Sequence, residues 1–286
     1  MMDIKKMQLL PVLLTLLVAA GCTSEKKSYA DRMEAEHKSD IPVANAASHI
    51  EQAGEVVTEM VSYARINGKN VEGYLARPKG RTDDLPGIIV IHEWWGLNDN
   101  IRMMTRRLAG EGYMALAVDL YNGQAAQTSG EAKKYMQQVS QNTQLAIDNL
   151  SQAAEYLDDE RDADDIGVIG WCFGGGWSLQ TALHMPDEID ATVIYYGQLV
   201  QDAERLKKLD MPVLGIFGAE DDGIPKEEVN KFRKTLNRLN KDAEIHIYDG
   251  ADHAFANPSG NRYNKKAAKD AWQKTISFLH THLEDD

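Results

Sequence analysis

Three features are scarce in this sequence: basic residues, long apolar runs and cysteine. Asp and Glu total 44 against 31 Lys and Arg, which gives a formal net charge of −13 at pH 7. A nucleic-acid backbone is bound by clustered lysine and arginine rather than by an excess of carboxylates. The charge balance therefore favours an acidic enzyme and gives no support to a nucleic-acid partner.

The longest apolar stretch stands at the N-terminus and is short. Two lysines precede an apolar stretch over residues 7–20, which is too short to span a membrane as a stable helix. Small residues, Ala19-Ala20-Gly21, stand at the end of this stretch and directly before Cys22. Together these features predict an export signal over residues 1–21. With cysteine at the new N-terminus, the segment resembles the lipobox of bacterial lipoproteins, although leucine is commonest where Ala19 stands.

This resemblance implies lipidation of Cys22 and attachment to a membrane of the cell envelope, facing the periplasm or the exterior. A plain signal peptide is the alternative. If Cys22 carries lipid, Cys172 is the one remaining thiol and no internal disulfide can form. Because an unpaired cysteine in an oxidising compartment invites unwanted pairing, its presence favours a chemical role in a sheltered pocket.

The chain divides into three parts by composition. After the signal, residues 22–54 are polar, charged and poor in large apolar side chains, which predicts a flexible tether. Residues 55–286 are expected to form one domain, because a chain that is 43% hydrophobic and this long can bury a sizeable core.

The order of predicted elements in that domain points to an α/β class. Residues 56–66 and 71–77 flank Asn67-Gly68, a pair that tolerates the positive φ of a tight hairpin. Residues 88–92 form a fully apolar strand of the kind found in parallel sheets covered on both faces. Further strands and helices then alternate, and Thr128 to Glu131 has the capping-box spacing that opens a helix. We expect a doubly wound, mostly parallel sheet with an N-terminal antiparallel hairpin and ligands beyond the carboxyl ends of its strands.

Gly170-Trp171-Cys172-Phe173-Gly174 is the most informative segment. It follows the apolar residues 166–169 and reads as a nucleophile elbow, in which small residues on either side hold the central side chain exposed at a strand-to-helix turn. The first N–H groups of the following helix can stabilise a thiolate and an oxyanion there. The alternative is an inert cysteine, since free cysteine is among the most buried residue types.

Two later segments place an acid and a histidine after predicted strands. Asp221 follows residues 213–218, and His253 follows residues 244–248. In an α/β-hydrolase the chain order is nucleophile, acid, histidine, which Cys172, Asp221 and His253 reproduce. Two alternatives are that Asp222 is the acid and that His253 is an ordinary surface histidine.

Four segments together resemble the dienelactone hydrolase family of α/β-hydrolases: His92-Glu93-Trp94-Trp95-Gly96, the Gly-x-Cys-x-Gly-Gly run, Gly-x-x-Asp at 218–221 and Asp252-His253-Ala254-Phe255. The resemblance covers about residues 56–283. It implies Cys172 as nucleophile, His253 as base and then acid, Asp221 as the orienting carboxylate and Glu93 as a group governing the resting thiol. It also implies the backbone N–H groups of Trp94 and Phe173 as the oxyanion hole. Trp95, Trp171 and Tyr121 are expected to line an apolar substrate pocket, and plain core packing is their alternative.

The sequence departs from the family pattern where the substrate carboxylate would bind. Characterised dienelactone hydrolases use two arginines, one shortly after an Asp-Leu-Tyr segment and one four residues beyond the histidine. Here Asn122-Gly123-Gln124 follows Tyr121, and Asn257 stands four residues beyond His253. Arg262 is a candidate substitute that nothing in the sequence places. We therefore expect an ester, lactone or thioester substrate rather than dienelactone itself.

No cofactor or metal is expected, because the histidines and carboxylates lack a compact ligand spacing such as His-Glu-x-x-His. The contrasting hypothesis is a lipid-anchored envelope binding protein that keeps the fold without useful activity.

Overall fold

A computed structural model describes residues 28–40, 42, 52–81 and 85–284. The expected signal over residues 1–21 and the lipidation site Cys22 lie outside the described residues. None of the helices within the described ranges is both long enough and apolar enough to cross a membrane.

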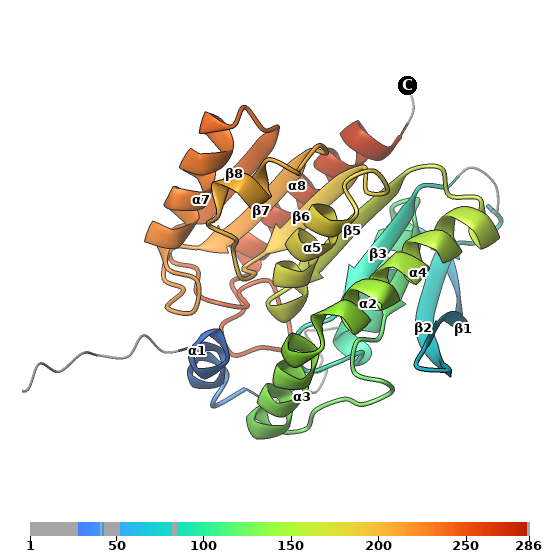
Figure 1. The fold of residues 1–286 in the computed structure, drawn as a ribbon, viewed down its shortest axis with the longest axis horizontal. Helices are drawn as coiled ribbons and strands as arrows, with labels where there is room; N and C mark the ends of the chain where they lie inside the picture. The colour runs from blue at the N-terminus through green and yellow to red at the C-terminus, as the bar shows by residue number, and fades with distance from the viewer. Residues whose placement is uncertain (1–27, 41, 43–51, 82–84, 285–286) are drawn as a thin grey trace, which may run out of the picture.

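The centre of the fold is one eight-stranded sheet with the spatial order β1-β2-β4-β3-β5-β6-β7-β8. Strands β3 to β8 run parallel to one another, whereas β1 pairs antiparallel with β2 and β2 pairs antiparallel with β4 (Figure 1). This is the mostly parallel sheet that the sequence predicts. The strands are β1 (Val56–Ile66), β2 (Lys69–Pro78), β3 (Gly87–Ile91), β4 (Met114–Val118), β5 (Ile166–Trp171), β6 (Ala191–Tyr195), β7 (Val213–Gly218) and β8 (Ala243–Tyr248).

The hairpin and the cap predicted from the sequence are both present. Asn67 and Gly68 adopt φ values of 51° and 75° at the turn between β1 and β2, as a tight hairpin turn requires. The Thr128 hydroxyl accepts a hydrogen bond from the Glu131 N–H at 3.2 Å and so caps helix α3. Local sequence therefore determines both features.

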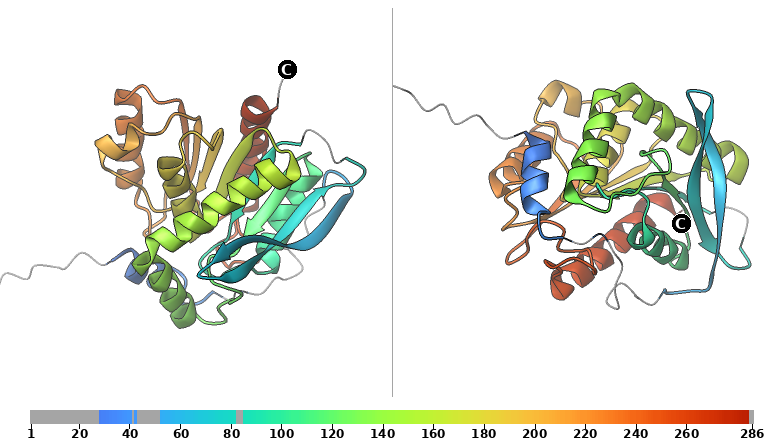
Figure 2. Two further views of the ribbon diagram at one scale, coloured as in Figure 1. Left: turned by 45° about the vertical axis from the view of Figure 1, so that its right-hand side comes forward. Right: turned by 90° about the horizontal axis from the view of Figure 1, so that it is seen from below.

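Helices cover both faces of the sheet. Figure 2 shows α2 and α8 on one face and α4 and α5 on the other, so the parallel strands β3 and β4 are buried along their whole length. The helices are α1 (Tyr29–Glu36), α2 (Asp99–Gly110), α3 (Ser129–Gln141), α4 (Thr143–Arg161), α5 (Phe173–His184), α6 (Ala203–Leu206), α7 (Lys226–Arg238) and α8 (Lys265–Leu283).

Helix α1 departs from the expectation that residues 22–54 are a flexible tether. It packs beside α3 (Figures 1 and 2). Ser28 caps it, and its Met33 is completely buried. Its charged residues find partners on the domain: Lys133 contacts Asp31 and Glu34, both at 2.7 Å. The composition is polar on average, but the helix docks through contacts that include one buried methionine and specific ion pairs.

Gly174, in the first turn of α5, is predicted to be intolerant of any side chain. A Cβ there would overlap the carbonyl oxygens of Ile91 and His92, so Gly174→Ala should lower the free energy of unfolding by about 1–3 kcal/mol. Gly130→Ala is the matched control, because a Cβ at this α3 position meets nothing within 4 Å and should stabilise by up to about 1 kcal/mol. Denaturant unfolding measures both changes, and equal stabilities of the two variants would contradict this account.

Candidate active site

Cys172 occupies a strained turn between β5 and α5. Its φ is +56°, a region that residues other than glycine rarely adopt and that is typical of functional turns. The turn is possible because the neighbouring glycines leave room: a Cβ at Gly170 would overlap Gly174, and one at Gly175 would overlap the Tyr195 carbonyl oxygen. The expected elbow geometry is therefore present, and it places the sulfur beyond the carboxyl end of β5.

His253 and Asp221 form a buried hydrogen-bonded pair in the loops after β8 and β7. The His253 Nδ1 lies 2.8 Å from the Asp221 Oδ2, and both side chains are fully buried. The other carboxylate oxygen accepts the Ile224 N–H at 2.7 Å. Asp222 is exposed, so of the two adjacent acids it is Asp221 that holds the ring. Since the carboxylate accepts the Nδ1 proton, Nε2 is left to face the site.

The sulfur of Cys172 lies close to two histidines. One ring nitrogen each of His37 and His253 and the Cys172 Sγ lie within 4.8 Å of one another. The contact between His37 Nε2 and Sγ measures 3.6 Å, and His253 Nε2 is buried without a hydrogen-bond partner. The arrangement supplies a base within reach of the thiol once small shifts align them.

Buried charges set the ionisation of these groups. Burial alone would raise the pKa of the Cys172 thiol, but the positive charge of the nearby His253 ring, together with the contact from His37, lowers that pKa to about 6. Burial opposes the charged form of His253 as well, yet the carboxylate of Asp221 and the sulfur raise the ring's pKa well above its usual value. The Asp221 pKa is lowered: burial opposes its ionisation, but His253 outweighs that effect. A thiolate facing an imidazolium is therefore the favoured resting state.

Glu93 is hydrogen-bonded by Asn257, which stands where characterised family members have an arginine four residues beyond the histidine. Asn257 Nδ2 donates to Glu93 Oε2 at 2.8 Å. Burial, with a smaller effect from the charge of Cys172, raises the pKa of Glu93 to about 7. Its carboxyl group can therefore exchange a proton near neutral pH, while Asn257 fixes its position.

The residues expected to form the oxyanion hole and the pocket all lie at the same edge of the sheet. Phe173 is the first residue of α5, so its N–H has no partner within the helix, and Trp94 follows β3 by three residues. Trp95, Trp171 and Tyr121 are almost fully buried. The Tyr121 ring packs 5.5 Å from that of Phe173, and the Trp95 ring 5.0 Å from that of Trp94. These contacts place the Tyr121 ring against the elbow residue Phe173 and the Trp95 ring against Trp94; their role as pocket walls stays a prediction.

Helix α1 and the turn after it add side chains that the sequence reasoning missed. Met33 Sδ lies 3.7 Å from Cys172 Sγ, and the His37 ring lies 4.7 Å from the Trp94 ring and 5.1 Å from the His253 ring. The one available signal in the sequence was the spacing of Met33 and His37, because residues four apart lie on the same face of a helix. Nothing local relates these residues to a cysteine 135 positions later.

Arg262 fastens this segment instead of facing an open substrate site. Its guanidinium donates to the Glu36 carbonyl and carboxylate at 2.6 and 2.9 Å, and to Asp40 at 2.6 Å. While α1 is docked, Arg262 is therefore not available to bind a substrate carboxylate in place of the missing arginines.

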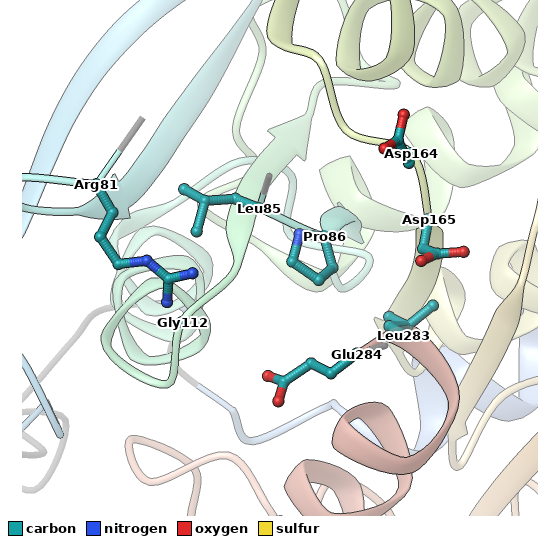
Figure 3. Close-up of a pocket in the computed structure, with 8 residues that line it drawn as sticks. All are labelled: Arg81, Leu85, Pro86, Gly112, Asp164, Asp165, Leu283 and Glu284. Atoms are coloured by element: carbon teal, nitrogen blue, oxygen red, sulfur yellow. The ribbon is translucent and has the colours of Figure 1, made fainter. Parts of the chain in front are cut away.

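The docked segment covers the Cys172 sulfur with Met33, and the space beside Glu93 is small. A pocket between Glu93, Trp171 and Tyr196 measures about 10 Å³, which accommodates roughly one water molecule. Figure 3 shows a larger pocket of about 310 Å³ lined by Pro86 and Asp165, among other residues. These two residues precede β3 and β5, so that pocket lies at the amino ends of the strands, away from Cys172. Parallel α/β sheets bind ligands at the opposite edge.

Comparison with known proteins agrees with this geometry. Residues 71–283 match the model of the dienelactone hydrolase family. Protein usf from Aquifex pyrophilus is 35% identical over 235 residues, covering 79% of this chain and 99% of that protein. A protein from Aquifex aeolicus, provisionally named a carboxymethylenebutenolidase, is 33% identical over 236 residues, again covering 79% and 99%.

A solved structure gives the same result. A Klebsiella pneumoniae protein described provisionally as a dienelactone hydrolase has a TM-score of 0.72 and 31% sequence identity, and the match covers 80% of this chain and all of that one. The matched residues contain the elbow and strands β3 to β8. The chain therefore belongs to the dienelactone hydrolase family and is a hydrolase with the α/β-hydrolase fold.

Proposed function

We propose that the protein hydrolyses a carboxylic ester, lactone or thioester through a Cys172-His253-Asp221 triad and an acyl-enzyme. The observation that carries this proposal is the 2.8 Å bond between His253 and Asp221, which leaves the second ring nitrogen on the side of the strained Cys172. A nucleophile next to a base that a third group orients is the arrangement that covalent catalysis requires.

In the proposed first half-reaction, the Cys172 thiolate attacks the carbonyl carbon and forms a carbon–sulfur bond. The oxyanion that develops accepts hydrogen bonds from the backbone N–H groups of Phe173 and Trp94; removing one such donor costs on the order of 10²–10³ in rate. Collapse of this intermediate breaks the bond to the alkoxide or thiolate leaving group, which takes a proton from His253. In the second half-reaction water gives a proton to His253, attacks the thioester and releases the acid.

The substrate class follows from what surrounds the elbow. Asn257 is engaged by Glu93, and Arg262 by Glu36 and Asp40. Among the described residues, the candidate replacement for the arginine pair that grips a carboxylate in characterised family members, Arg262, is thus engaged elsewhere, and the walls are aromatic. We therefore infer an uncharged acyl group of modest size as substrate.

We further propose export and lipid attachment through Cys22. The support is the N-terminal pattern of two lysines, a short apolar stretch and small residues before this cysteine. Radiolabelled fatty acid should be incorporated by the wild type and not by Cys22→Ser.

The triad predicts a specific loss of activity. Cys172→Ala should reduce hydrolysis of short p-nitrophenyl esters at least 10³-fold, because the acyl-enzyme cannot form. His184→Ala is the control, since this exposed histidine lies at the far end of α5 and bonds its own helix. Equal turnover by Cys172→Ala and wild type would exclude the nucleophile. Absence of turnover over a broad substrate panel, with retention of a specific ligand, would favour the binding-protein alternative.

The ionisation of Cys172 predicts the pH profile of its alkylation. Since only the thiolate reacts and the pKa is lowered to about 6, labelling by iodoacetamide should be half-maximal at about pH 6. It should be nearly constant above pH 7 and fall on acidification. His253→Gln removes the positive partner and should move the midpoint upward. Mass spectrometry of the labelled protein measures both, and a wild-type midpoint between pH 8 and 9 would show an ordinary thiol.

The docked α1 predicts that substrate entry requires this segment to move. Arg262→Ala removes four hydrogen-bond contacts to residues 36–40, and a charge-assisted bond contributes about 1.5–3 kcal/mol. The variant should therefore label at Cys172 roughly tenfold faster than wild type. Arg102→Ala is the control, because Arg102 pairs with exposed Asp99. Equal labelling rates for Arg262→Ala and wild type would mean that α1 does not limit access.

A further inference from the structure

Cys172, His37 and His253 form a compact set of nitrogen and sulfur donors. Their three candidate ligand atoms lie within 4.8 Å of one another, and all three side chains are buried. Two come from the sheet edge and the third from the turn after α1. Thiolate and imidazole are the donors that zinc and related thiophilic ions prefer.

Each histidine carries a carboxylate on the ring nitrogen that points away from the sulfur. His37 Nδ1 lies 2.6 Å from Asp40 Oδ2, and His253 Nδ1 lies 2.8 Å from Asp221 Oδ2. Metal-binding histidines almost always have such a partner, because it fixes the ring and makes the ligating nitrogen more basic. Base catalysis needs one carboxylate–histidine pair, which Asp221 and His253 supply. The second pair, His37 with Asp40, is therefore not explained by the hydrolytic reaction.

A second observation points into the same space. His253 Nε2 is fully buried and has no hydrogen-bond partner. A buried polar atom without a partner is costly, and a metal ion beside the sulfur would satisfy it.

The spacing fits tetrahedral coordination. Bonds of about 2.3 Å to sulfur and about 2.0–2.1 Å to nitrogen separate the two donor atoms by roughly 3.6 Å, and His37 Nε2 is 3.6 Å from Cys172 Sγ. The remaining pairs, at up to 4.8 Å, need to close by about an ångström. Met33 Sδ, 3.7 Å from Cys172 Sγ, stands at a distance suited to a fourth position, where a water is the alternative ligand.

We propose that Cys172, His253 and His37 form a binding site for a thiophilic transition-metal ion such as Zn²⁺, assembled when α1 docks on the sheet edge. Binding forms one metal–sulfur and two metal–nitrogen bonds, and no atom changes oxidation state. The proton that His253 holds opposite the thiolate and the Nε2 proton of charged His37 leave for solvent, and the ion loses the waters that the three ligands replace. The single positive charge that remains on the ion and its thiolate, together with that of Arg262, is balanced by the carboxylates of Asp40 and Asp221.

This site and the hydrolytic reaction exclude one another. A metal-bound sulfur is not free to attack a carbonyl carbon, and the ion joins α1 to the domain through His37. The metal proposal does not depend on the proposed hydrolysis, because binding requires only the ligand set.

The test is a titration of the full chain, first stripped with a chelator, with Zn²⁺ followed by calorimetry and with Co²⁺ followed by absorption. We expect one equivalent to bind and a thiolate-to-cobalt charge-transfer band to appear. His37→Ala should weaken Zn²⁺ binding at least tenfold, and Asp40→Asn should weaken it about 10–100-fold, as loss of a ligand's supporting carboxylate does. His184→Ala, which changes an exposed histidine outside the cluster, should bind as the wild type does.

Three results would overturn the proposal: no saturable binding to the wild type, equal affinity of wild type and His37→Ala, or a cobalt complex without the charge-transfer band. Asp40→Asn keeps the size of the side chain and so tests the site even if His37→Ala unfolds. Failure of the hydrolytic proposal is seen separately, as Cys172→Ala that keeps esterase turnover while losing the cobalt band.

Discussion

The strained backbone of Cys172 is the constraint on which the site depends. A residue with φ of +56° stays there only where its surroundings leave no alternative, and here glycines at 170, 174 and 175 allow α5 to press against β3 and β6. Because β5 lies at the centre of the sheet, between β3 and β6, the sulfur is fixed relative to the loops that carry Asp221 and His253.

Around that sulfur the buried charges alternate in sign. Asp221, His253, the Cys172 thiolate, His37 and Asp40 follow one another, and Arg262 closes the series on Asp40. Burial by itself disfavours the ionised forms of the two carboxylates, the two histidines and the thiolate. Each is retained because its neighbour has the opposite charge, so the groups stabilise one another as a set, and removing one member leaves an uncompensated buried charge beside the sulfur.

The fold and the core of the site could be predicted because their signals are local. Apolar strand runs, the Asn67-Gly68 turn and the glycines around Cys172 each act through residues nearby in sequence, and the order of Asp221 and His253 follows from the strands before them. Helix α1 could not be predicted in this way. Its segment is polar on average, and its docking depends on Met33, Arg262 and Lys133, which come together only in three dimensions.

The site residues that this chain shares with its family and the site residues that it adds come from different parts of the sequence. The family model matches residues 71–283, which contain Cys172, Asp221 and His253. His37 and Asp40 stand before that region, so the second carboxylate–histidine pair comes from outside the matched part of the chain. A histidine needed for the shared chemistry would be expected within the matched part. His37 lies in the turn after α1, whose Met33 contacts the sulfur, and this position suits a role in when the sulfur is accessible and in the proposed metal site.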